Sequence, residues 1–138
     1  MLRLAGEAFD GWLPFSPTPG EYAAGYRAVR EAAERFGRDP ESVATGAYLT
    51  VAVADSPAQA GREFDAYIRG YYGVPGEVMA KAQASHTGTL ESAAEWFAEY
   101  RAAGAQVLVV RLARPSLSDY NETVTQLLSA ARSRDPVT

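Results

Sequence analysis

A helix followed by a strand between Gly88 and Arg111 constrains the fold of this chain more than any other feature of its sequence. Thr89 has a hydroxyl that can cap the helix, and Gly104 supplies the left-handed residue at which it ends. The run Val107–Val110 is apolar throughout, which is typical of a parallel strand buried on both faces. The apolar positions of the helix recur at helical spacing and are Leu90, Ala93, Ala94, Phe97 and Ala98. The segment therefore predicts one unit of a parallel α/β sheet.

The rest of the chain divides into further helices and strands at turn residues such as Gly37 and Pro57. Trp12–Phe15 is apolar and is expected to be a short first strand, whereas Ser85–Gly88 is expected to be a connector. In chain order, the sequence predicts a helix at 2–9, a strand at 12–15, a helix at 19–36, a strand at 45–53, a helix at 56–71, a short helix at 77–82, the helix and strand described above, and a helix at 120–131.

This alternation predicts a single α/β domain, residues 1–138, with about three parallel strands and right-handed crossovers. In the middle strand, the larger apolar residues Leu49, Val51 and Val53 are expected to face the helices. Tyr48 and Thr50 would then face the other side, where no element is expected to cover them. Because exposed apolar surface and open sheet edges favour association, we expect a homodimer with Tyr48 and Thr50 in its interface.

The composition excludes several classes of function. The 138 residues carry a net charge of -4, and no basic patch is evident, so neither nucleic acid nor an anionic membrane is an expected partner. Neither a signal peptide nor an apolar run long enough to cross a bilayer is present, and a cytoplasmic location is expected. The chain has no cysteine and one histidine, so thiol chemistry and a histidine-rich metal site are excluded and no metal is expected.

Four pieces of the sequence, in this order and spacing, carry a resemblance to a known family. They are Leu4–Pro14, Ala32–Pro40, Gly88–Glu91 and Ala102–Ala105. Together they resemble the C-terminal part of the luciferase-like flavin-dependent monooxygenases. The resemblance implies a partial (β/α) barrel that corresponds to the last third of a TIM-type barrel, with FMN or a deazaflavin at the C-terminal mouth of the strands. It also implies that the strand which helps to hold the cofactor phosphate lies before Met1.

Four residues are candidates for the chemistry of such a site. Arg111 stands at the C-terminal end of its strand, where its guanidinium can meet a phosphate or carboxylate. The structural alternatives are that it snorkels to solvent at the strand end or pairs with an acidic neighbour. His86 is a candidate proton donor, and the alternative is a solvated loop histidine. Trp12 and Phe15 can stack on a flavin ring, or they can pack in the core.

Tyr67, Tyr71 and Tyr72 form an aromatic cluster at a helix end. We expect this cluster to cover the core or an interface.

Two functions from different classes remain open at this point. The first is a flavin-dependent monooxygenase or related oxidoreductase, in which a dimer rebuilds a cavity for FMN or a deazaflavin. The second is a non-catalytic, dimerising relic or interaction module that keeps the family's packing without its cofactor. The family resemblance favours the flavin-dependent monooxygenase, with the non-catalytic module as the alternative, and the sequence alone does not decide whether the chain is an enzyme.

Overall fold

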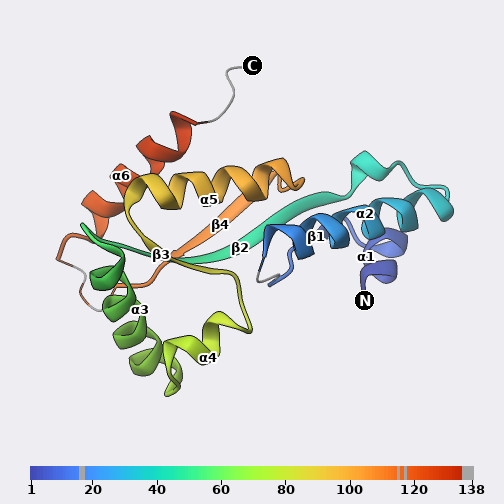
Figure 1. Ribbon diagram of the computed structural model, residues 1–138. Helices are drawn as coiled ribbons and strands as arrows, with labels where there is room; N and C mark the ends of the chain where they lie inside the picture. The colour runs from blue at the N-terminus through green and yellow to red at the C-terminus, as the bar shows by residue number, and fades with distance from the viewer. Residues whose placement is uncertain (16–17, 115, 117, 135–138) are drawn as a thin grey trace.

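The structure is a computed structural model, and it describes residues 1–15, 18–114, 116 and 118–134. Figure 1 shows a parallel sheet with α5 and α6 on one side and α3 and α4 on the other. The elements, in chain order, are α1 (Leu2–Ala8), β1 (Gly11–Trp12), α2 (Pro19–Arg35), a 3₁₀ turn (Pro40–Ser42), β2 (Ala44–Val53), α3 (Pro57–Tyr72), α4 (Gly76–Ala80), β3 (Ser85–Gly88), α5 (Leu90–Ala102), β4 (Val107–Leu112) and α6 (Tyr120–Arg132).

Local chemistry explains where the main helices begin and end. Thr18 begins α2 in a capping box with Glu21, and the hydroxyl of Thr89 accepts a hydrogen bond from the first turn of α5. Gly104 follows α5 with φ of 109°, in the left-handed region that a side chain would disfavour. The helix-capping signals in the sequence therefore have the role that the sequence predicts for them.

The sheet is four-stranded and parallel, with β2 at its centre. Thr50 of β2 pairs with Ser85 of β3 and with Arg111 of β4, so β3 and β4 flank β2 on opposite sides. The expectation that Ser85–Gly88 is a connector is wrong, because these residues form β3. The predicted fold class, a partial α/β barrel with a parallel sheet and alternating helices, is confirmed, and the sheet does not close.

The two faces of β2 differ as the alternation of its side chains predicts. The helix face contains Leu49, Val51 and Val53, which pack in the largest buried cluster with residues of α5 and α6 such as Phe97 and Leu127. We call the opposite side, which contains Tyr48, Thr50 and Ala52, the interior face. It is the side that would line the interior of a closed barrel.

Helix α3 covers the C-terminal half of the interior face. Ala52 packs there with Ala60, Phe64 and Ile68 of α3, in a second buried cluster. The expectation that this face lacks any cover is therefore wrong for half of it. Thr50 is 0% exposed, so the expectation that it lies in an intermolecular interface does not fit the structure.

Strand β4 lies at an open edge of the sheet and pairs with β2 alone among the described strands. Val107 is 56% exposed on the interior face, and Val110 is 39% exposed on the helix face. The expectation that the run Val107–Val110 is buried on both sides is therefore wrong within this chain. Strand β4 therefore exposes apolar side chains on both faces of the sheet, as an unprotected edge strand does.

Candidate functional site

The uncovered half of the interior face carries an aromatic cluster around one arginine. We call Phe15, Tyr48, Tyr71, Tyr72 and Arg111 the interior-face patch. Tyr48 comes from β2 and Arg111 from β4, whereas Tyr71 and Tyr72 come from the last turn of α3. The ring of Phe15 lies 5.3 Å from that of Tyr48, and Tyr71 lies 4.7 Å from Tyr72. Phe15 is 57% exposed and Tyr71 is 68% exposed, so the patch offers flat aromatic surface to a ligand or partner.

Arg111 is held at the centre of this patch by two tyrosines. Its Nε donates a hydrogen bond to the Tyr48 hydroxyl at 2.9 Å, and its Nη1 donates one to the Tyr72 hydroxyl at 2.6 Å. The guanidinium carbon lies 5.2 to 5.6 Å from the ring centres of Tyr48, Tyr71 and Tyr72. These contacts fix the direction of the guanidinium and stabilise its charge by cation–π attraction.

The charge of Arg111 has no acidic partner in the part of the chain that the structure describes. Burial disfavours the charged guanidinium, but the hydrogen bonds to Tyr72 and Tyr48 outweigh it and raise the pKa of Arg111. Arg114, three residues later, contrasts with it, because its guanidinium forms an ion pair with Asp119 at 2.6 Å. One of the two predicted alternatives for Arg111, pairing with an acidic neighbour, is therefore not found among the described residues.

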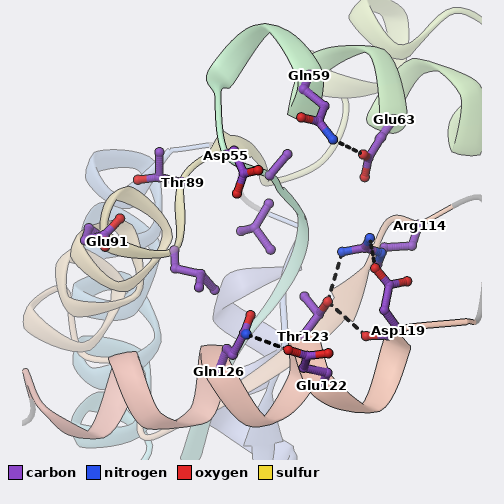
Figure 2. Close-up of a pocket in the computed structure, with 13 residues that line it drawn as sticks. Asp55, Gln59, Glu63, Thr89, Glu91, Arg114, Asp119, Glu122, Thr123 and Gln126 are labelled. Carbon is purple, nitrogen blue, oxygen red and sulfur yellow. Dashed lines mark hydrogen bonds and ion pairs between the residues drawn. The ribbon is translucent and has the colours of Figure 1, made fainter.

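A crevice of about 460 Å³ lies at the carboxyl ends of β2, β3 and β4, where parallel sheets commonly bind ligands. Figure 2 shows Arg114 inside it, with dashed contacts to Asp119 and Thr123. Among the described residues that line it, Arg114 is the only cation, and five are acidic: Asp55, Glu63, Glu91, Asp119 and Glu122. This surplus of negative charge disfavours a phosphate group.

The acidic lining of the crevice follows from the helices that surround it. Asp119 is the N-cap residue of α6, and Glu91 and Glu122 lie in the first turns of α5 and α6, where the helix dipole favours an anion. Hydrogen bonds from its own backbone N–H and from Thr89 lower the pKa of Glu91. These carboxylates therefore have a structural explanation that requires no ligand.

His86 lies on β3 and points to the helix side of the sheet. It pairs in register with Val51, and its Nε2 lies 2.9 Å from the Ser92 hydroxyl of α5. The imidazole also stacks on Trp96, with 5.3 Å between ring centres. Burial lowers the pKa of His86, although the charge of Glu99 opposes this shift. The structure places this candidate proton donor between β3 and α5, away from the interior-face patch.

Trp12 packs under α2 on the helix side of the sheet. Its ring lies 4.8 Å from that of Tyr22, and a side chain at Gly25 would collide with it. Trp12 is thus part of the core, and the structure does not bring it together with Arg111. Phe15, three residues later, does join the patch through Tyr48.

The sequence does not reveal two of the residues that hold Arg111. Its pattern places Tyr72 in a helix-end cluster and Tyr48 on the open face of the sheet, but no sequence signal links either residue to Arg111. They lie 39 and 63 positions away from it in the chain. No group of three or more potential metal-ligating side chains lies together within the described ranges, and no helix there is long and apolar enough to cross a membrane.

Comparison with known proteins places this arrangement in a family. The family model "Luciferase-like monooxygenase" matches residues 1–109, which is most of the chain. The chain therefore belongs to the luciferase-like monooxygenase family.

Individual relatives are considerably longer than this chain. The phthiodiolone/phenolphthiodiolone dimycocerosates ketoreductase of Mycobacterium kansasii is 33% identical over 89 residues, which is 62% of this chain and 24% of the relative. The corresponding ketoreductase of Mycobacterium tuberculosis strain H37Rv is 30% identical over 89 residues, with 62% and 23% of the two chains covered. The chain thus spans about a quarter of the curated relatives it matches.

Solved structures share the fold at low sequence identity. The coenzyme F420-dependent tetrahydromethanopterin reductase of Methanopyrus kandleri matches with a TM-score of 0.71 and 14% identity, over 99% of this chain and 48% of its own. A riboflavin lyase solved with modified FMN and riboflavin matches with a TM-score of 0.73 and 13% identity, over 99% and 41% of the two chains. An F420-dependent secondary alcohol dehydrogenase matches with a TM-score of 0.73 and 15% identity, over 95% and 46%.

Proposed function

We propose that this protein forms the C-terminal part of a flavin- or deazaflavin-dependent oxidoreductase barrel, with the cofactor ring lying against the interior-face patch. The observation that carries the proposal is the exposed aromatic surface of Phe15, Tyr71 and Tyr72 on the side of the sheet that lines a barrel. Membership of the luciferase-like family supports it, as do fold relatives whose names include FMN or F420.

The chemistry of the patch fits such a cofactor. A planar conjugated ring can stack offset or edge-on against tyrosine and phenylalanine rings at the spacing found here. A bound flavin or deazaflavin supplies the electron or hydride transfer, so the chain itself has to bind the ring, orient it and exclude water. The acidic strand-end crevice does not fit the cofactor phosphate, so the interior face is the better location.

The function requires further strands. Because the sheet does not close and β4 is exposed on both faces, additional protein must cover it before a dry cavity exists. We propose that a second copy of the chain supplies this cover, which gives a homodimer.

The test is a titration of FMN against the purified protein, followed by the visible absorbance and the flavin fluorescence. Saturable binding, with quenching of the flavin by the tyrosines, is the expected result. A deazaflavin is titrated in parallel, because the family resemblance does not choose between the two cofactors. An absence of saturable binding of either compound rejects the proposal.

The second candidate is an interaction module without a cofactor. The observation that favours it is the surplus of carboxylates in the strand-end crevice. Parallel sheets usually bind their ligands at this position, and the negative charge disfavours a phosphate there. This module would associate through β4 and the interior face but would not bind flavin. Association without flavin binding would support it.

A further inference from the structure

Arg111 is placed unlike an ordinary surface arginine. It stands on an apolar strand and is half-buried, although a guanidinium there loses part of its hydration. Residues from two other elements, Tyr48 and Tyr72, converge on it with hydrogen bonds of 2.9 and 2.6 Å. Both tyrosines also direct their ring faces at the charge. The surroundings therefore orient and retain a cation without neutralising it.

The hydrogen bonds leave most of the guanidinium available. Of the five N–H donors of an arginine, the two tyrosine hydroxyls use one on Nε and one on Nη1. The Nη2 group of Arg111 has no partner in the described part of the chain. A planar guanidinium with adjacent free donors is suited to bind the oxygens of an anion in a bidentate manner.

We propose that Arg111 is the anion-recognition residue of the interior-face patch, where it binds an anionic oxygen group of an aromatic ligand that stacks on Phe15 and Tyr71. This inference rests on the function proposed above and names the residue that recognises the cofactor's charge. In FMN the anionic group is the phosphate; the alternative contact is a ring carbonyl oxygen, which carries only a partial negative charge. Tyr48 and Tyr72 are positioning residues, because they act through Arg111.

Arg114 supplies a matched control for this role. It lies on the same segment, and its guanidinium is tied to the carboxylate of Asp119 and the hydroxyl of Thr123 in the acidic crevice. Loss of Arg114 removes the same net charge from the protein without changing the interior face. An effect of Arg111 on binding that came only from net charge would therefore appear in both variants.

The experiment titrates FMN, and separately riboflavin, against the parent protein, Arg111→Ala and Arg114→Ala, with flavin fluorescence as the readout. We expect Arg111→Ala to raise the Kd for FMN by roughly ten- to a hundredfold and Arg114→Ala to leave it within about twofold. Binding of FMN but not riboflavin, with competition by inorganic phosphate, assigns the contact to the phosphate. Equal binding of both flavins, with the same loss in Arg111→Ala, assigns it to the ring.

Two further variants distinguish a loss of binding from a loss of folded structure. Tyr72→Phe keeps the ring but removes the hydroxyl that accepts from Nη1, so we expect a several-fold weaker affinity with an unchanged circular dichroism spectrum. Arg111→Lys keeps the charge but loses the planar fork, and it should restore only part of the affinity. Equal FMN binding by the parent and Arg111→Ala would overturn this inference alone. No saturable binding by the parent would overturn it together with the proposed function.

Discussion

Phe97 is a residue on which the stability of the core depends. It is 3% exposed and lies in the largest buried cluster, between α5 and the helix face of β2. Phe97→Ala should lower the free energy of unfolding by about 3–5 kcal/mol, because a cavity of that size does not collapse fully. Thermal and urea unfolding measure this loss. Phe36→Ala is the matched control, since Phe36 is 54% exposed, and it should change the stability little. Similar losses in the two variants would contradict the assigned packing.

His86 should make the stability depend on pH. Burial lowers the pKa of its imidazole in the folded protein below the ordinary value of about 6.5. The unfolded chain therefore binds the proton first as the pH falls. The free energy of unfolding should decrease from about pH 6.5 downward until the folded-state pKa is reached. Urea unfolding across this range, compared with that of His86→Asn, isolates the contribution. The same pH dependence in both proteins would show that His86 titrates normally in the folded state.

Among the helices and strands, the sequence predicts best those whose ends are set by residues within the element itself. The cap at Thr89 and the stop at Gly104 lie within the segment they delimit, so α5 was identifiable from the sequence. Strand β3 is not identifiable from the sequence. Ser85–Gly88 carry little apolar signal, and they are extended because they pair with β2. The sequence also does not predict which face of the sheet α3 covers. An apolar stripe shows that a helix packs, but it does not tell which face of a sheet it covers.

The candidate site was predictable only in part, for the same reason. The position of Arg111 near the end of a parallel strand follows from the sequence pattern. Its tyrosine partners come from β2 and α3 and become neighbours only in the fold. Residue type alone makes His86 and Trp12 candidates, but the alternation of β3 and the packing of α2 place both on the helix side of the sheet. Side-chain direction in a strand depends on register, which composition does not specify.

Strand β4 should be the element through which copies associate. Its exposed residues include Val107 and Val109 on the interior face, and neither proline nor lysine protects its edge. Val109→Lys should weaken self-association, because pairing would require the burial of an ammonium group. Sedimentation equilibrium of the variant and the parent measures the difference. Val78→Lys, at a position 51% exposed on α4, is the control and should associate like the parent. Equal association by Val109→Lys would exclude β4 from the interface.

The open sheet is the feature of the whole molecule on which assembly and cofactor binding depend. The chain has the fold of the luciferase-like family but covers 48% or less of the matched structures reported above, and its sheet leaves β4 and half of the interior face uncovered. A surface of this kind is stabilised when a partner buries it, at about 25 cal/mol for each Å² of apolar area. Assembly and cofactor binding should therefore be coupled, because the cavity exists only where the sheet is covered.

Sedimentation velocity of the purified chain at tens of micromolar tests whether the open sheet requires a partner copy. We expect a homodimer, with the interior-face patch and β4 shielded, and a further shift toward the dimer when FMN is added. The measurement is made with and without FMN at the same protein concentration. A single monomeric species under both conditions would contradict the claim that the open sheet requires a partner copy.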